Sequence, residues 1–279
     1  MPPSRGSDGE VRVIIDGPRD PRLNMAIDEA IARLRGETGV DTVRVYMWKP
    51  TGITLGRRQD AGDVDLEEAS RRGYIVVRRP TGGGALLHRE DWEVTYSVVL
   101  SSSHRLYELD VASSAAEIAR GVALAVERLG AEAGVGGFRG LGESGLCYVR
   151  RGSSDVVVRG VKVSGSAQRR AWGALLQHGT LLLDLDPDEW LSVVRVEGEA
   201  RRVFEERVGG LRRVIGWVDP VDAMAVLAES LVEVLGYRGY YMGGLSREEM
   251  SLAMKLYRLK YSRPEWNLEG RDVEATLPP

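Results

Sequence analysis

Two side chains in this sequence stand out as candidates for catalysis, and the first is Cys147. It is the one cysteine among 279 residues, and it follows residues 130–145, which hold seven glycines in sixteen positions. A lone cysteine is more often a small buried apolar residue than a nucleophile. A basic neighbour would, however, lower the pKa of its thiol and supply thiolate. Cys147 is therefore a candidate nucleophile, with a purely structural role as the alternative.

The second candidate is Lys162, one of only four lysines in a chain that otherwise uses arginine for its cations. It lies in the strand-like run Val161-Lys162-Val163, directly before Ser164-Gly165-Ser166. An outward-facing charge on an alternating strand is the ordinary interpretation. In the functional interpretation its ammonium points into a cleft, where it polarises a carbonyl or binds a phosphate. Because this compact ammonium is not interchangeable with a guanidinium, the scarcity of lysine favours a functional Lys162.

A glycine loop supplies the clearest candidate for ligand binding. The segment Arg78-Arg79-Pro80-Thr81-Gly82-Gly83-Gly84-Ala85-Leu86-Leu87-His88 separates two strand-like runs. Three consecutive glycines allow positive φ and a close approach of the backbone to a ligand, so that N–H groups can face an anion or a carbonyl. A flexible hairpin turn would explain the glycines equally well, but the flanking arginines and histidine favour a binding loop. It is not a Walker A loop, since no Gly-Lys-Ser/Thr follows, nor a Rossmann fingerprint, since a strand comes next. His88 and His178 are candidate general bases, or simply hydrogen-bonded histidines.

A mixed α+β domain is expected to position these residues. Apolar runs predict strands at 11–15, 43–48, 53–56, 74–77, 94–100, 156–158, 161–163, 174–185 and about 237–242. Periodicity and capping residues predict helices at 24–35, 63–72, 112–129, 187–194, 199–206, 220–235 and 246–259. Two hairpins are predicted, one over 43–56 around Pro50-Thr51-Gly52 and one over 156–163 around Arg159-Gly160. This order predicts mixed β-sheets packed with helices.

The predicted organisation is one domain with a short flexible start. Residues 1–10 are expected to form the flexible N-terminus, 11–218 a catalytic domain, and 219–279 a helical C-terminal extension packed on that domain. Asp219 is a good N-cap and Pro220 a good first helical residue for the helix that opens the extension.

Composition limits the function classes. The sequence is 43% hydrophobic and 28% charged, with a net charge of −3, which argues against general nucleic-acid binding. One cysteine excludes an internal disulfide framework and fits a reducing cytosol, and with three histidines no Cys/His zinc site is expected. No apolar run approaches the roughly 18 residues of a membrane helix, and the N-terminus lacks a signal-peptide core. We therefore expect a cytoplasmic protein that binds neither nucleic acid nor membranes and holds no structural metal.

Five segments resemble, in the same order, motifs of the lipoate–protein ligase and octanoyltransferase family. They are Asn24-Met25-Ala26-Ile27-Asp28-Glu29-Ala30, the glycine loop 78–88, Lys162-Val163-Ser164-Gly165-Ser166-Ala167-Gln168, Gln177-His178-Gly179-Thr180-Leu181-Leu182, and Lys260-Tyr261-Ser262 with Glu265-Trp266-Asn267. Each motif alone is weak, but five in register span nearly the whole chain. The resemblance implies the α+β catalytic fold that biotin–protein ligases also use. It further implies transfer of an eight-carbon acyl group to one lysine of a lipoyl domain.

The same resemblance implies roles for individual residues. Lys162 would hold the acyl carbonyl or an adenylate phosphate, and the loop from Arg79 to His88 would line the acyl and carboxyl-end site. The strand that carries Gln177 and His178 would form another wall. The expected substrate-binding residues are Arg79, Thr81, Gly82, Gly83, Gly84, Ala85, His88, Ser164, Gly165, Ser166, Ala167, Gln177, His178 and Gly179, and the expected catalytic residues are Cys147 and Lys162.

The resemblance leaves two enzymatic branches open. Octanoyltransferases of this type take octanoate from acyl carrier protein through a cysteine in a Cys-aromatic pair, and Cys147-Tyr148 stands fifteen residues before Lys162, as in that branch. Gln177 also matches the transferases, whereas ligases more often carry a second histidine there. Gly84 matches the ligases, because the transferases usually have arginine at that position. We favour the transferase, which needs no cofactor; a ligase would use ATP and Mg²⁺ and leave Cys147 without a role.

The implied partners follow from the branch. A transferase would take its donor from acyl carrier protein. The acceptor would be a lipoyl domain of a 2-oxoacid dehydrogenase acyltransferase subunit or the glycine-cleavage carrier protein. A third hypothesis is a non-catalytic protein that binds lipoyl domains without acylating them, although Lys162 and the glycine loop are both present.

Overall fold

Two β-sheets form the framework of this computed structural model, which describes residues 9–136 and 152–271. The large mixed sheet has the strand order β11-β1-β2-β6-β10-β9-β8-β7 and the small sheet the order β4-β3-β5. The strands are β1 (Glu10–Ile15), β2 (Thr42–Tyr46), β3 (Gly52–Leu55), β4 (Ile75–Arg78), β5 (Leu86–His88), β6 (Glu93–Ser101), β7 (Gly134–Val135), β8 (Val156–Val158), β9 (Val161–Ala171), β10 (Ala174–Leu182) and β11 (Gly239–Met242).

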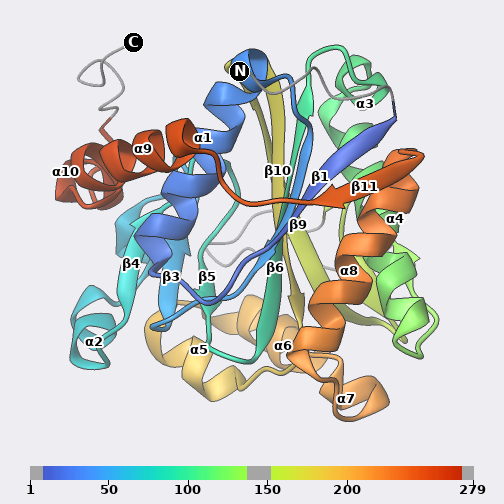
Figure 1. Cartoon of the computed structure of the whole chain (residues 1–279). Coiled ribbons are helices and arrows are strands. Elements are labelled where there is room, and N and C mark those ends of the chain that lie inside the picture. The colour runs from blue at the N-terminus through green and yellow to red at the C-terminus, as the bar shows by residue number, and fades with distance from the viewer. Residues whose placement is uncertain (1–8, 137–151, 272–279) are drawn as a thin grey trace.

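Helices cover both faces of the large sheet. The helices of the described residues are α1 (Pro21–Thr38), η1 (Ala61–Asp63), α2 (Leu66–Arg71), α3 (Arg105–Glu108), α4 (Val111–Arg128), α5 (Pro187–Val193), α6 (Gly198–Arg207), α7 (Arg212–Ile215), α8 (Pro220–Leu235), α9 (Arg247–Leu256), the π-helical turn η3 (Tyr257–Tyr261) and α10 (Pro264–Asn267). In Figure 1, α1 and α9 lie on one side of the sheet and α4 and α8 on the other. None of the described helices is long and apolar enough to cross a membrane.

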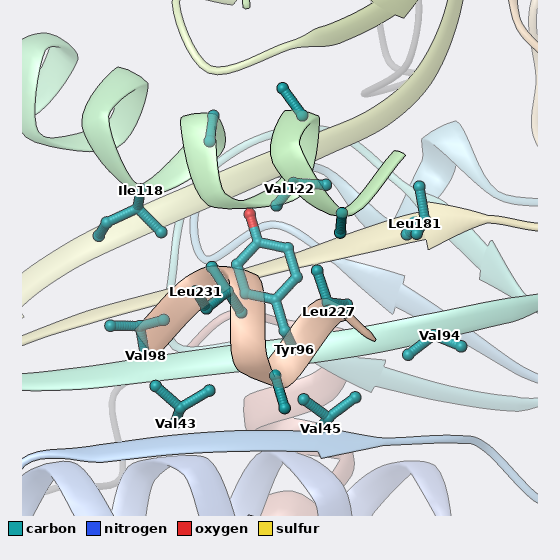
Figure 2. Packing of buried hydrophobic residues seen from close by; sticks show 14 of the residues in the cluster. Val43, Val45, Val94, Tyr96, Val98, Ile118, Val122, Leu181, Leu227 and Leu231 are labelled. Atoms are coloured by element: carbon teal, nitrogen blue, oxygen red, sulfur yellow. The ribbon is translucent and has the colours of Figure 1, made fainter. Parts of the chain in front are cut away.

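The larger hydrophobic core lies between the sheet and the α4–α8 pair. Figure 2 shows Tyr96 of β6 reaching between these helices, against Val122 of α4 and Leu227 and Leu231 of α8. All four side chains are fully buried. Burying one such Val or Leu side chain stabilises the fold by roughly 1.5–3 kcal/mol, so this layer fixes β6 and its neighbours firmly.

Helix α1 packs on the opposite face and brings acidic residues into the interior. Its N-cap is Asp20, whose side chain accepts a hydrogen bond from the Arg22 N–H, and Pro21 occupies the first turn, where the missing N–H costs nothing. Apolar residues such as Met25 and Ile31 join a second core cluster that also contains α9 residues. The same buried face carries Asp28 and Glu29, both fully buried.

The predicted hairpin over 156–163 is confirmed, and the one over 43–56 is wrong. In the first, β8 and β9 pair antiparallel around Arg159 and Gly160, both at positive φ. In the second, β2 belongs to the large sheet, whereas β3 pairs with β4 and β5 in the small one. Gly52 is not a turn residue but the first residue of β3. A Cβ at this position would lie 2.5 Å from Cγ of Pro21. The glycine permits α1 to approach β3.

Several predicted boundaries also move. The glycine loop ends earlier than expected, because Leu86–His88 forms β5 and pairs with β3. Strand β9 continues through the Ser-Gly-Ser segment to Ala171, and β10 ends at Leu182 rather than 185. Helix α9 ends at Leu256 and passes into η3. The strand expected at about 237–242 is present as β11, which pairs parallel with β1.

Candidate active site

A pocket lies where the small sheet, α1 and the centre of the large sheet meet. It is lined by Met25, Tyr46, Trp48, Thr54, Arg79, Leu86, His88, Thr95, Gly165, Ser166, Ala167, His178, Gly179 and Thr180. We call it the acyl pocket, after the ligand that the family resemblance predicts for it. Seven of these residues were predicted from the sequence: Arg79, His88, Gly165, Ser166, Ala167, His178 and Gly179. The remaining lining is largely apolar and aromatic, which suits a hydrocarbon chain with a few polar contacts.

Arg79 fixes the glycine loop from within. Its buried guanidinium donates to the carbonyl oxygens of Gly82 at 2.7 Å and Gly84 at 2.8 Å. In a trans peptide the carbonyl and the following N–H point in opposite directions, so the N–H groups of Gly83 and Ala85 point away from Arg79. Gly83 has φ +94°, a conformation that glycine adopts without strain. The loop is thus ordered by charge-assisted hydrogen bonds.

Arg78 joins this loop to the end of the described chain. Its guanidinium donates to the carbonyl oxygens of Gly56 at 2.7 Å and Trp266 at 2.9 Å. Its backbone N–H donates to Oδ1 of Asn267 at 3.0 Å, and Nε1 of Trp266 donates back to its carbonyl at 2.8 Å. The C-terminal motif therefore acts on the site indirectly, by holding the residue before Arg79. Arg78 was not among the predicted site residues.

His178 is held between α1 and the glycine loop. Its Nδ1 lies 3.2 Å from Oδ2 of Asp28, and its Nε2 lies 2.5 Å from Oγ1 of Thr81. Burial lowers the pKa of His178 despite the neighbouring carboxylate. A neutral imidazole that donates from Nδ1 to Asp28 accepts the Thr81 hydroxyl at Nε2. Sequence separation hides this arrangement, because Asp28 lies 150 residues before His178.

Asp28 is the centre of a buried polar network. Its Oδ1 accepts from Nη1 of Arg44 at 2.8 Å and from the Ser97 hydroxyl at 2.8 Å, and its Oδ2 accepts from the Tyr46 hydroxyl at 2.8 Å. Burial raises the pKa of Asp28, but the hydrogen bond from His178 and the Arg44 charge outweigh it, and the net pKa is lowered. The ionised carboxylate is fully partnered, as a buried charge requires.

His88 forms part of the pocket wall. Its Nδ1 lies 2.6 Å from Oε1 of Glu93 and its Nε2 lies 2.8 Å from Oγ1 of Thr54. Its ring stacks on Trp48 with 4.0 Å between the ring centroids, and Nε1 of Trp48 donates to Oγ1 of Thr95 at 2.7 Å. Both nitrogens of His88 therefore have partners, and this orients the ring as a flat side of the pocket.

Lys162 lies against the pocket wall and is paired with an acid that the motif analysis missed. Its Nζ is 2.7 Å from Oδ1 of Asp155, and both side chains are almost fully buried. Burial raises the pKa of Asp155, although the Lys162 charge opposes this. A Cβ on Gly165, which lines the pocket, would lie 3.6 Å from Nζ. The predicted nucleophile Cys147 lies outside the described residues.

The other predicted residues lie outside the acyl pocket, and some of them line a second one. Thr81, Gly82 and Gly83 line a neighbouring pocket that also includes the cations Arg57, Arg58 and Arg169. Gln177 lies under α4, where its Nε2 donates to the carbonyl of Ala115 at 3.3 Å. Ser164, Gly84 and Ala85 line neither pocket. Within residues 9–136 and 152–271, no three His, Cys, Asp or Glu side chains gather as metal ligands would.

The sequence of this fold and site matches one family over most of its length. Residues 20–233 match the profile of the lipoyl protein ligase A/B catalytic domain. The chain belongs to this family. This confirms the resemblance drawn from the five motifs, and the catalytic fold that it implied agrees with the solved structures below.

Named proteins and solved structures also match this chain along most of its length. A protein from Kyrpidia tusciae named octanoyltransferase LipM is 42% identical, over 92% of this chain and 97% of its own length. One of the same name from Brevibacillus brevis is 34% identical over 92% and 98%. A solved lipoate-protein ligase A bound with ATP is 27% identical, with a TM-score of 0.80 over 94% of this chain and 100% of its own. A bi-partite lipoate protein ligase from Thermoplasma acidophilum is 26% identical, with a TM-score of 0.80 over 95% and 98%.

Proposed function

We propose that this chain is an octanoyltransferase that moves an octanoyl group from acyl carrier protein to one lysine of a lipoyl domain. Family membership supports acyl transfer in protein lipoylation, and the relatives named octanoyltransferase LipM match along 92% of the chain. The single observation that carries the proposal is the juxtaposition of the acyl pocket with the buried Lys162 ammonium. An apolar pocket whose wall at Gly165 adjoins a cation suits an acyl chain with a carbonyl at its end.

The proposed reaction consists of two displacements. The Cys147 thiolate attacks the carbonyl of the carrier-bound octanoyl thioester, the new C–S bond forms, and the carrier leaves as a thiol after taking up a proton. The acceptor lysine amine then attacks the enzyme thioester, loses a proton, and releases Cys147. In both steps the Lys162 ammonium and N–H groups of the glycine loop would stabilise the oxyanion. The position of Cys147 and the carrier as donor are parts of the proposal.

The second candidate is an ATP-dependent lipoate–protein ligase. The solved lipoate-protein ligase A bound with ATP has a closely similar fold. The pocket beside the glycine loop, with Arg57, Arg58 and Arg169, has the charge that phosphates need. Under this alternative Lys162 and the basic loop would hold an acyl-adenylate, with Mg²⁺ on the phosphates, and Cys147 would have no part.

Intact-mass measurement separates these candidates. The protein is incubated with octanoyl carrier protein, without ATP or acceptor, beside the Cys147→Ser variant. We expect the mass of one octanoyl group on the wild-type chain and none on the variant. Addition of a lipoyl domain should then remove the group from the enzyme and add it to the domain.

Other outcomes would point elsewhere. Absence of the adduct, together with ATP-dependent acylation of a lipoyl domain by both proteins, would exclude the transferase and support the ligase. Binding of a lipoyl domain with no transfer from either donor would support the non-catalytic binder.

A further inference from the structure

The acid that faces Lys162 is itself unusually well fixed. Oδ1 of Asp155 lies 2.7 Å from Nζ of Lys162, and the two side chains are 4% and 2% exposed. Oδ2 of Asp155 accepts a hydrogen bond from the Gly152 N–H at 2.8 Å, and the backbone carbonyl of Asp155 accepts one from the Gly136 N–H at 2.7 Å. Because both its backbone and its carboxylate are held, Asp155 cannot easily swing away from its cation.

Gly152 is a glycine because Asp155 needs the space. A Cβ at Gly152 would lie 2.9 Å from Oδ1 of Asp155 and 3.4 Å from Oδ2. Contacts under 3.0 Å force something to move. An alanine at this position would therefore push the carboxylate without removing its charge.

The ammonium of Lys162 lies against the pocket wall at a second glycine, Gly165. A Cβ on Gly165 would lie 3.3 Å from Cε of Lys162 and 3.6 Å from Nζ, and Gly165 lines the acyl pocket. The neighbouring segments add uncharged groups: Thr180 of β10 lies opposite Gly165, and the N–H of Gly209 donates to the carbonyl of Lys162 at 3.2 Å. The carboxylate of Asp155 is a charge that the structure sets against this ammonium, at 2.7 Å.

We propose that Asp155 is a positioning residue that keeps Lys162 as an ammonium ion beside Gly165. This proposal rests on the proposed function, in which that ammonium stabilises a carbonyl oxyanion and does not accept a proton. Burial alone would favour the neutral amine, because a lysine taken out of water loses solvation of its charge. A fixed carboxylate at 2.7 Å opposes that preference. Asp155 acts through Lys162 and need not touch the substrate.

The protonation state can be measured directly, without any activity assay. The chain has four lysines, at positions 49, 162, 255 and 260, so the ¹³Cε signals of ¹³C-labelled lysine can be assigned with Lys→Arg variants. We expect Asp155→Asn to move the Lys162 signal at neutral pH from the position of an ammonium ion toward that of a neutral amine, because the opposing carboxylate charge is lost. Asp155→Glu should restore most of the ammonium signal. The signal of Lys260, which pairs with Glu29, is the internal control for folding and should not move.

A variant that retains the charge guards against loss of structure. Gly152→Ala should move the Lys162 signal in the same direction by a smaller amount, because it displaces the carboxylate. Should Asp155→Asn fail to fold, this variant decides. A Lys162 signal that is the same as in the wild type, in folded Asp155→Asn or in Gly152→Ala, would overturn the proposal.

The pH profile of octanoyl transfer then separates the two roles of Lys162. If the ammonium is the active form, transfer by Asp155→Asn should fall relative to the wild type as the pH rises, and should approach the wild-type rate at lower pH. A variant that is instead more active than wild type at neutral pH would identify Lys162 as a base and overturn the assignment. If wild-type protein transfers no octanoyl group from any donor, the proposed function fails, while the Lys162 signal still tests the pairing.

Discussion

At the scale of single residues, Gly179 shows how tightly the strands around the acyl pocket approach one another. A Cβ at this position would lie 2.6 Å from the Tyr96 hydroxyl oxygen and 2.8 Å from the carbonyl oxygen of Gly165. The tyrosine belongs to the main core (Figure 2), and Gly165 lines the pocket. Neither neighbour can yield without moving the site or the core.

We expect Gly179→Ala to lower the free energy of unfolding by roughly 1–3 kcal/mol and to reduce acyl transfer. Urea unfolding followed by circular dichroism gives the first quantity and the mass assay the second. The matched control is Gly36→Ala near the end of α1, where a Cβ meets nothing within 4 Å and the substitution should be neutral or stabilise by about 0.4–1 kcal/mol. Equal effects of the two substitutions would contradict the steric argument.

Motif spacing finds residues of the candidate site, but not the partners that hold them in place. Lys162 and His178 stand out by residue type, whereas Asp28 meets His178 only because α1 folds onto the sheet. Asp155 is a different case. The predicted hairpin turns at Arg159 and Gly160 and aligns Val157 with Lys162, so its register already placed an acid two residues further back close to that lysine. The motif analysis did not use this signal.

At the scale of elements, α1 is locked to the C-terminal turn by a buried charge cluster. Nζ of Lys260 lies 2.9 Å from Oε2 of Glu29, with both side chains fully buried, and the Tyr261 hydroxyl donates to the same carboxylate. Burial raises the pKa of Glu29, but the Lys260 and Arg33 charges and the tyrosine hydrogen bond outweigh it, and the net pKa is lowered. The carboxylate is the form that holds the two elements together.

We expect Glu29→Gln to cost about 3–5 kcal/mol of stability at pH 7, because it leaves Lys260 buried without its counter-charge. A lowered pKa means that the contribution of Glu29 is complete above about pH 4.5, its ordinary value, and is lost as the pH falls further. Urea unfolding at pH 7, 5 and 3.5 should therefore show the gap between variant and wild type narrowing below that value. Glu68→Gln on the exposed face of α2 is the control and should change little. A difference in unfolding free energy between the two proteins that does not change with pH would contradict a contribution from the Glu29 carboxylate.

Elements were easier to predict than their pairing. Local periodicity located most helices and strands, since amphipathic patterns depend only on near neighbours. The 43–56 hairpin failed because strands β2 and β3, although consecutive, take partners from different sheets. Strand β3 pairs parallel with β4, and β1 pairs parallel with β11 from the far end of the chain. Such pairings depend on where intervening helices pack, which no short window of sequence contains.

At the scale of the whole molecule, the two ends of the chain complete each other. Strand β1 lies between β2 and β11 (Figure 1). Arg12 on β1 donates to both carboxylate oxygens of Glu249 on α9, at 2.6 and 2.9 Å, and this pair is largely buried. The segment after residue 219 thus supplies a strand to the sheet and helices to both of its faces.

We expect a chain that ends at Val218 not to fold alone. It would lack Leu227 and Leu231, which pack on α4, and Tyr261 and Trp266, which pack beside α1; it would also lack the Trp266 contacts of Arg78. The truncated chain should lose near-ultraviolet circular dichroism and bind a hydrophobic dye, whereas the full chain unfolds cooperatively. A truncated chain with native near-ultraviolet signal and a cooperative urea transition would show instead that residues 11–218 fold independently of 219–279. Such a chain should still lose acyl transfer, because the contacts between Arg78 and Trp266 cross this boundary. Restoration of activity by adding residues 219–279 as a separate peptide would show that the loss comes from contacts with that segment.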